Sequence, residues 1–501
     1  MSSTTPPSRA VHPGIVLALV CGVQFMVILD LAIVNVAIPS VQADLRLDPA
    51  DLQWVVITYG LTLGGFLLLG GRAADLFGRR AVLVAGLAIF TAASLVAGLS
   101  GSFAQLVVAR GIQGVGAALA APAALSILTN TFTEGVPRNK ALGIFAAVGG
   151  SAGSIGVIAG GLLTEGPGWE WIFLINVPIG VVLVGLVAAF VPRGVRPARG
   201  AVDVAGAVTV TAGLMAIVYA INRSVEIGWT APATQAFLAG GAAMLGAFAV
   251  IESRAVDPIV PPTVFRRRTL TAANVVNVLL WGAFFATIYQ GTLFMQQVLG
   301  YSAVETGAAW LAATTSSLVV SAAIAARFVG RFGAGTSLVV GQLIVAGGLL
   351  YLSQAPSDAA YWIDLFPSFL AFGVGLGFSV MAAQVAGFRG VDPADAGLAG
   401  GLLETSREVG GALGVAVVAS VAIARSDDAR RLLGVGEDTE TVALTEGFQR
   451  GVLVTAGLSL AAALAAGVLL RRAERRSAPQ SDDDASGEAS PEVRVLEEIR
   501  T

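Results

Sequence analysis

The sequence predicts an all-α polytopic membrane protein, and three observations support this fold class. Of the 501 residues, 55% are hydrophobic and only 13% are charged, whereas a soluble domain carries about 25% charged residues. Fourteen separate runs are apolar over about 20 residues, which is enough to cross a bilayer as a helix rising about 1.5 Å per residue. Polar connecting segments separate these runs. The chain is therefore expected to span the membrane about fourteen times.

The predicted spans follow one another from residue 14 to residue 470. A polar tail, residues 1–13, precedes the first run. That run is too long for the core of a signal peptide and lacks a small-residue cleavage site, so we expect it to remain as a helix. The predicted spans are 14–38, 54–71, 81–99, 104–129, 140–163, 171–191, 204–222, 233–251, 270–297, 304–326, 335–353, 362–388, 396–424 and 449–470.

Basic residues in the loops orient the spans, because cytoplasmic loops carry an excess of Lys and Arg. With the N-terminus inside, twenty basic residues fall on the cytoplasmic side, including three in the loop at 71–80. Six fall outside: Arg46, Arg223, Arg425, Arg430, Arg431 and Arg450. Both termini are therefore expected in the cytoplasm. Twelve spans, with 204–222 and 233–251 not crossing, would keep the same parity, but length and hydropathy favour fourteen.

We expect the chain to divide into two halves with an insertion between them. Paired halves are typical of transporters with a binding site at the membrane midplane. An acidic, polar C-terminal segment has the composition of a disordered tail. Residues 426–448 are expected to form a longer external loop. The predicted parts are a cytoplasmic tail at 1–13, a six-helix bundle at 14–191, two inserted helices at 192–253, a second six-helix bundle at 254–470 and a cytoplasmic tail at 471–501.

Several chemistries are excluded by composition. The chain holds one cysteine, Cys21, and one histidine, His12, which leaves neither a disulfide within the chain nor a metal site built from Cys and His. The only lysine, Lys140, follows Asn139 where a phosphate-binding loop needs glycine, so we expect no ATP hydrolysis. No His-containing catalytic triad is available in the spans. We therefore expect no enzyme activity, no cofactor and no nucleic-acid partner.

Ionisable residues inside the spans point to function, because each costs about 2.5 to 3.5 kcal/mol at a helix centre. Asp30 lies in the first span and Arg110 in the fourth. The helical rise places them about 12 Å and about 9 Å from the outer ends of their spans, so they can pair if the helices adjoin. Because arginine stays protonated, Asp30 is the group that can titrate. The alternative is a buried ion pair that only locks two helices.

A second group of ionisable residues lies in the thirteenth span. Glu404, Arg407 and Glu408 are spaced three and four residues apart and project from one side of the helix. Two carboxylates beside one arginine leave one acid in excess, whose protonation is open to change. This pattern predicts a second proton site at Glu404 and Arg407. The alternative is an intrahelical salt bridge near the cytoplasmic interface.

Polar and aromatic residues within the spans are candidates for lining a substrate cavity. A cavity for a bulky, partly apolar molecule needs apolar and aromatic walls with a few convergent polar groups. Each such residue can instead form a hydrogen bond between helices or anchor the chain at the interface. The candidate residues are Tyr59, Gln113, Trp281, Tyr289, Gln290 and Gln384.

Two motifs resemble those of a known transporter superfamily. Residues 71–80 resemble the loop signature G-x-L-A-D-R-x-G-R-R of major facilitator superfamily transporters, with Ala73 in place of Leu and Leu76 in place of a basic residue. Residues 110–114 are similar to the fourth-helix motif R-x-x-Q-G of the same superfamily, whose arginine is implicated in proton coupling.

Four further stretches are similar to motifs of the fourteen-helix drug–proton antiporters within that superfamily. Residues 29–39 resemble L-D-x-T-I-V-N-V-A-L-P, and residues 169–180 resemble W-R-W-I-F-x-I-N-x-P-x-G. Residues 156–161 share the glycines of G-P-x-x-G-G, but Val157 replaces the proline whose bend is associated with antiport. Residues 400–414 resemble G-G-L-L-N-T-S-R-Q-V-G-G-A-L-G, with glutamates where Asn and Gln are usual.

The resemblance implies a major facilitator fold of two six-helix bundles plus two inserted helices. It implies a proton-driven antiporter that exports hydrophobic drugs, antibiotics or a related metabolite across the bacterial cytoplasmic membrane, with Asp30 and Arg110 in the proton-coupling path. Its expected partners are protons, the lipid bilayer and a small hydrophobic or cationic substrate, and we expect a monomer. It also implies a cytoplasmic latch that holds the outward-open state, made of Gly71, Asp75, Gly78, Arg79 and Arg80.

Two other functions fit parts of the sequence. A proton-coupled uptake symporter would use the same fold, and only the direction of transport separates it from an exporter. A non-transporting membrane sensor would need no titratable residue in its spans, so its function would survive the substitution Asp30→Asn. The resemblance to fourteen-helix antiporters favours export.

Overall fold

The structure is a computed structural model that describes residues 12–46, 49–192, 203–255, 258, 260, 268–392, 395–433 and 439–471. Within these residues, all the regular secondary structure is helical, as the sequence predicts. Of the two predicted tails, 1–13 and 471–501, only residues 12, 13 and 471 fall among those described.

The first half comprises the helices up to the end of the predicted sixth span. Its first helix, α1, begins with a proline, whose missing backbone N–H costs nothing because the first turn of a helix has no acceptor for it. The bounds of these helices are α1 Pro13–Leu45, α2 Pro49–Phe77, α3 Arg79–Gly98, α4 Phe103–Thr131, α5 Val136–Glu165, α6 Trp171–Leu174 and α7 Asn176–Phe190.

The second half starts after two helices that pack on each other, α8 and α9. Several of its spans contain π-helical turns, which are named η here. The bounds are α8 Val204–Ile227, α9 Pro232–Glu252, α10 Arg268–Leu293, η2 Phe294–Val298, α11 Ala303–Ala309, α12 Leu311–Val319, η3 Val320–Ala325, α13 Ala326–Phe332, α14 Ala334–Leu352, η4 Tyr361–Leu365, α15 Phe366–Phe388, α16 Ala396–Leu433, α17 Thr439–Ala465 and η6 Ala466–Leu470.

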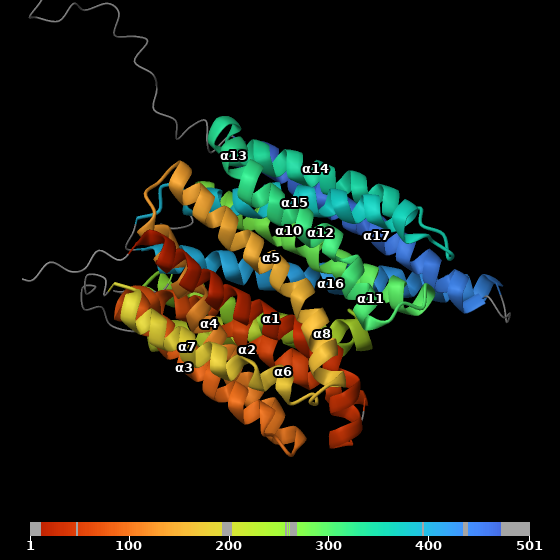
Figure 1. Ribbon diagram of the computed structural model, residues 1–501, viewed down its shortest axis with the longest axis horizontal. Helices are drawn as coiled ribbons and strands as arrows, with labels where there is room; N and C mark the ends of the chain where they lie inside the picture. Colours follow the sequence, from red (N-terminus) through yellow and green to blue (C-terminus); the bar gives the residue numbers. More distant parts are fainter. Residues whose placement is uncertain are drawn as a thin grey trace, which may run out of the picture.

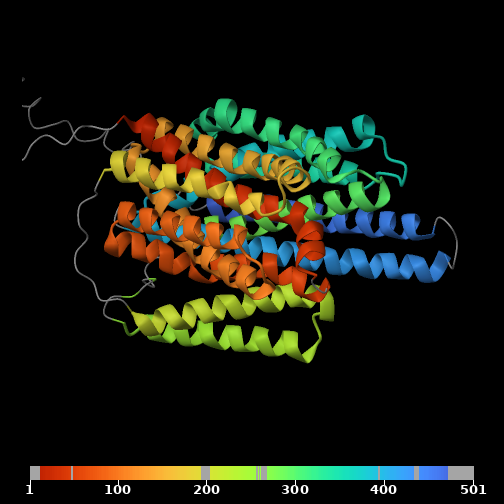
Figure 2. The same ribbon diagram turned by 60° about the horizontal axis from the view of Figure 1, so that its bottom comes forward.

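The helices run side by side in two groups, α1–α7 and α10–α17 (Figure 1). Two seams join the groups. At one, α2 and α4 pack on α16; at the other, α5 packs on α11, α12, α13 and α15. Figure 2 shows α8 and α9 along the outside of the molecule, where α8 contacts both α2 and α16. The inserted pair therefore lies beside the first seam.

The structure has thirteen of the fourteen predicted spans as helices that are long and apolar enough to cross a membrane, counted among the described residues. The predicted span 204–222 falls in α8, where the apolar stretch Ala205–Ile221 is shorter than the others. The 24 residues of α8 are about 36 Å long, against about 30 Å for the hydrocarbon core of a bilayer. The fourteenth span therefore stays a prediction.

The sixth predicted span is broken into two helices at Ile175. Pro178 lies four residues after Leu174 and has no backbone N–H, so the Leu174 carbonyl cannot make the usual helical hydrogen bond. Ile175 nevertheless keeps helical dihedral angles, and Trp171–Phe190 is continuous as one span. Asn176, the first residue of α7, is fully inaccessible to solvent.

The prediction of an external loop over 426–448 is wrong in large part. Helix α16 continues to Leu433, and α17 already begins at Thr439. Beyond the apolar region, ion pairs support the helices: Arg430 pairs with Asp427 one turn before it and with Glu440 of α17. The apolar run ends at residue 424, because the part of the helix that lies in water needs no apolar surface. Both helices project past their neighbours (Figure 2).

Candidate functional site

Asp30 is the centre of a fully buried polar network in the first bundle. Its Oδ2 atom lies 2.6 Å from Nη1 of Arg110 on α4. Its Oδ1 atom accepts hydrogen bonds from Nε2 of Gln113 at 2.7 Å and from Nδ2 of Asn176 at 2.8 Å. Neither Asp30 nor Arg110 has any exposed surface. Three donors from two other helices therefore surround one carboxylate.

Arg110 is held from several directions. Its Nε atom donates to the backbone carbonyl of Val55 on α2 at 3.0 Å, and Nη1 donates to Gln113 at 2.7 Å. The guanidinium carbon lies 4.2 Å from the centre of the Tyr59 ring and 5.6 Å from that of Phe173. Cation–π contacts of this kind stabilise a desolvated cation. Arg110 is thus a fixed positive charge held against the Asp30 carboxylate.

Two residues of this network were not among the sequence predictions. Ser94 on α3 accepts a hydrogen bond from Gln113 at 2.8 Å, and Asn176 on α7 donates to Asp30. Ser94 gives no signal in the sequence, since small polar residues are common in membrane helices. Asn176 lies within the stretch 169–180 that resembles an antiporter motif, and this was the one signal that could have identified it.

Glu404, Arg407 and Glu408 form a second charged cluster, called the triad below. Nη1 of Arg407 lies 2.5 Å from Oε2 of Glu404, and its Nη2 lies 2.9 Å from Oε1 of Glu408. The Arg407 guanidinium carbon is 5.7 Å from the centre of the Trp281 ring on α10. Glu404 and Arg407 are 5% and 7% exposed. These ion pairs lie within one helix, as the alternative of an intrahelical salt bridge expects, and the second proton site stays a prediction.

Among the substrate-cavity candidates, Tyr59 and Gln113 belong to the Asp30 network and Trp281 lies against Arg407. The remaining three are more scattered. Tyr289 is half-buried on α10, Gln290 lies against Gly451 of α17, and Gln384 is half-buried on α15. The structure thus brings half of the candidates next to buried charges.

The predicted latch joins the two bundles through Asp75. Its carboxylate accepts hydrogen bonds from the backbone nitrogens of Gly397 at 3.0 Å and Leu398 at 2.9 Å, at the start of α16. Arg79 lies 3.6 Å from the same carboxylate. A carboxylate at a helix N-terminus satisfies unpaired N–H groups and interacts favourably with the helix dipole. Arg80 instead donates to the carbonyl of Ala188 on α7, within the first bundle.

Glycines allow this approach. Gly78 has a φ of +95°, a left-handed conformation that favours glycine, and it connects α2 to α3 in one residue. A Cβ atom on Gly71 would collide with the carbonyl oxygen of Gly397, and a Cβ on Gly397 would collide with that of Gly71. Larger residues at either position would hold α2 and α16 apart, so the glycines are part of the contact that Asp75 completes.

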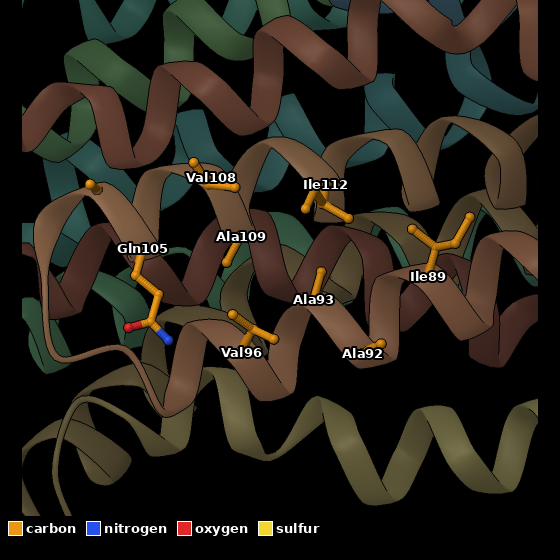
Figure 3. Close-up of a pocket in the computed structure, with 9 residues that line it drawn as sticks. Ile89, Ala92, Ala93, Val96, Gln105, Val108, Ala109 and Ile112 are labelled. Carbon is orange, nitrogen blue, oxygen red and sulfur yellow. The ribbon is translucent and has the colours of Figure 1, made fainter.

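A groove of about 560 Å³ lies between α3 and α4 (Figure 3). None of the substrate-cavity candidates lines it. Two of the lining residues directly precede network residues in the chain: Ala93 precedes Ser94, and Ala109 precedes Arg110. Its lining residues are Ile89, Ala92, Ala93, Val96, Ala104, Gln105, Val108, Ala109 and Ile112. The exposed Val96, Val108 and Ile112 place it on the apolar outer face.

Residues 20–415 match the family model described as the Major Facilitator Superfamily. The chain belongs to this superfamily. It is therefore a multi-pass membrane transporter and not an enzyme, as the motifs predict. The match begins within α1 and ends within α16, and so covers both charged clusters and the latch.

Curated relatives within the superfamily match nearly the whole chain. The chain is 37% identical over 457 residues to the puromycin resistance protein pur8 of Streptomyces alboniger, covering 91% of this chain and 88% of the relative. It is 39% identical over 425 residues to the cephamycin export protein CmcT of Amycolatopsis lactamdurans, covering 84% and 87%.

Among solved structures, one that resembles this fold is that of the human organic anion transporter MFSD10 (TETRAN). The two structures superimpose with a TM-score of 0.63 and share 15% sequence identity, over 92% of this chain and all of the other. At that identity the likeness concerns the fold alone.

Proposed function

We propose that this chain is a secondary transporter of the bacterial cytoplasmic membrane that exports a hydrophobic drug, antibiotic or related metabolite in exchange for protons. The observation that carries the proposal is a titratable carboxylate, Asp30, buried beside a fixed charge in a superfamily transporter. Relatives named for puromycin resistance and cephamycin export support the substrate class.

Asp30 couples the proton to the transport cycle. When it is ionised, it holds Arg110 on α4 and Asn176 on α7. Protonation removes the charge on which the ion pair depends, so states of the bundle that differ in this contact bind the proton with different affinity. A ligand shifts a conformational equilibrium only by such a difference in affinity. A proton that binds one state better therefore biases alternating access.

The Asp75 contact acts as the latch that keeps the cytoplasmic end closed while the opposite end is open. Its hydrogen bonds to α16 join the bundles at one end of the first seam. Export requires this end to open for substrate and to close again before release. One proton moving through 100 mV supplies about 2.3 kcal/mol, which supports roughly a fiftyfold gradient of a neutral substrate at one-to-one exchange.

Transport by inverted membrane vesicles tests the proposal. The vesicle lumen is made acidic, and puromycin or a cephamycin is added outside, the side that corresponds to the cytoplasm. An exporter should dissipate the pH gradient on addition, whereas an uptake symporter should do so only when the lumen is preloaded. A sensor should give no response in either arrangement.

Asp30→Asn is the decisive variant, since it keeps the shape of the side chain and removes its charge. It should abolish the response, while Asp358→Asn, in an exposed loop residue outside both charged clusters, should leave it unchanged. A wild-type response that survives in Asp30→Asn at equal protein level would rule Asp30 out of the coupling path.

A further inference from the structure

The two buried charged clusters differ in net charge. In the first, Asp30 and Arg110 balance each other. In the triad, Glu404 and Glu408 share the single cation Arg407, so one negative charge remains if both carboxylates are ionised. An unbalanced charge enclosed among apolar helices is costly. Binding one proton removes that cost.

The surroundings of the triad supply no second cation among the described residues. The groups acting electrostatically on Glu404 and Arg407 are the triad itself and the neutral Tyr59 of α2. From α4, Arg110 is already paired with Asp30. From α17, Glu440 and Glu446 pair with Arg430 and Arg425 at the far end of α16.

The other neighbours of the triad are uncharged. Helix α10 presents the Trp281 ring to Arg407. On the opposite side, the Cβ atom of Glu408 and the side chain of Val218 on α8 both lie next to Gly64 of α2. The inserted helix therefore brings an apolar residue, Val218, to this side of the triad, while Arg223 of α8 lies five residues further along the helix.

We propose that the triad binds one exchangeable proton on Glu404, which gives this chain a proton site in its second bundle in addition to Asp30. Glu404 is favoured over Glu408 on two grounds. Its side chain is 6% exposed against 15% for Glu408, and burial disfavours the charged form. Oε1 of Glu408 also accepts from both Nε and Nη2 of Arg407, at 3.2 and 2.9 Å, so Glu408 takes the larger share of the single cation.

The consequence for transport rests on the proposed function. The antiporter motif that residues 400–414 resemble has Asn and Gln where this chain has Glu404 and Glu408. The second proton site therefore depends on these two residues. A cycle that loads and releases this proton together with that of Asp30 moves two protons per substrate instead of one. The exporter then reaches a steeper substrate gradient from the same proton motive force.

Infrared spectroscopy of the full-length protein tests for the proton without requiring transport. The sample is the purified chain in dodecyl maltoside micelles, because this detergent has no carbonyl group. The difference spectrum between alkaline and neutral buffer is recorded for the C=O stretch of a protonated carboxyl group, identified by its shift in heavy water. Exposed carboxylates are ionised at neutral pH and do not contribute.

The wild type should show the band of about one carboxyl group per chain. Glu404→Gln removes the group that carries the proton, and Glu408→Gln leaves one carboxylate against one arginine, so both variants should lose the band. Asp30→Asn should keep it, as should Glu165→Gln, a matched change at an exposed position. The Gln of Glu408→Gln also occurs in the resembling motif, so this variant tests the proposal even if Glu404→Gln fails to fold.

Three outcomes would overturn the proposal: no band in the wild type, a band that persists in Glu408→Gln, or a band that disappears in Asp30→Asn. The second would mean that shared charge is not the cause, and the third would place the proton on Asp30. A wild-type band in a protein that does not move puromycin would leave the triad proton standing and reject the export function.

Discussion

The carboxylate of Asp75 on α2 lies 3.0 Å from the backbone nitrogen of Gly397 on α16, so a side chain of one bundle caps a helix of the other. The first N–H groups of a helix have no acceptor within it. Here a residue more than 300 positions earlier in the chain supplies that acceptor. Any motion that separates the bundles at this end must break the cap.

Replacing Asp75 with asparagine should favour the separated state. An amide oxygen still accepts hydrogen bonds but carries no charge, and hydrogen bonds to charged groups contribute about 1.5 to 3 kcal/mol. A loss of about 2 kcal/mol changes the population ratio roughly 30-fold. Electron–electron double resonance between spin labels at Phe77→Cys and Phe332→Cys, in a Cys21→Ser background, measures the separation. Both label sites are more than 40% exposed.

The control for this measurement is Asp358→Asn, which lies in an exposed loop. Its label distances should match those of the parent protein. Equal distances in Asp75→Asn and the parent would show that the cap contributes nothing to closure.

Gly397→Ala should obstruct the same contact sterically. The added methyl group would collide with the carbonyl oxygen of Gly71 and with the carboxylate of Asp75. We expect the rate of puromycin-dependent gradient loss to fall at least about tenfold, because overpacking a close contact costs about 1 to 3 kcal/mol. Gly330→Ala is the matched control, since its Cβ meets nothing within 4 Å. Normal transport by Gly397→Ala would contradict the expectation.

Asn176→Leu should slow transport by weakening the network around Asp30. The asparagine amide donates a hydrogen bond of 2.8 Å to the Asp30 carboxylate, and a hydrogen bond to a charged group contributes about 1.5 to 3 kcal/mol. We expect the rate of puromycin-dependent gradient loss in vesicles to fall about tenfold at equal protein level. Asn130→Leu is the control, because the Asn130 amide donates to a carbonyl of its own helix, α4. Normal transport by Asn176→Leu would contradict the expectation.

Glu440→Gln should have a small, salt-dependent effect on stability. Glu440 pairs with Arg430 across the projecting ends of α16 and α17, and both side chains are largely exposed. Exposed ion pairs contribute about 0.2 to 1 kcal/mol and are screened by salt. The melting midpoint should fall slightly in dilute buffer and match the wild type in concentrated salt. A difference that grows with salt would argue against an ion pair as the cause.

The sequence was sufficient to predict thirteen of the spans and the possible pairing of Asp30 with Arg110. Apolar length sets the spans, and charges inside them are too costly to occur without partners. Apolar length predicts the part of a helix that lies in the membrane and not the whole helix. The predicted thirteenth span therefore ends at residue 424, whereas α16 continues through polar residues to Leu433.

Other parts of the site could not have been predicted. The partners of Asp75 are backbone N–H groups of Gly397 and Leu398, which every residue type carries and which leave no pattern in the side chains. Asn176 reaches Asp30 because α7 packs on α1, a contact that no pattern in the sixth span reveals. Such contacts are set by tertiary packing.

The groove between α3 and α4 has an apolar lining and opens on the outer face of the first bundle. Its lining includes Ala93 and Ala109, each of which directly precedes a member of the Asp30 network in the chain. The attraction between two charges grows as the dielectric constant of their surroundings falls. An apolar outer face suits a hydrocarbon environment, and in such an environment the bond between Asp30 and Arg110 is stronger than it would be beside water.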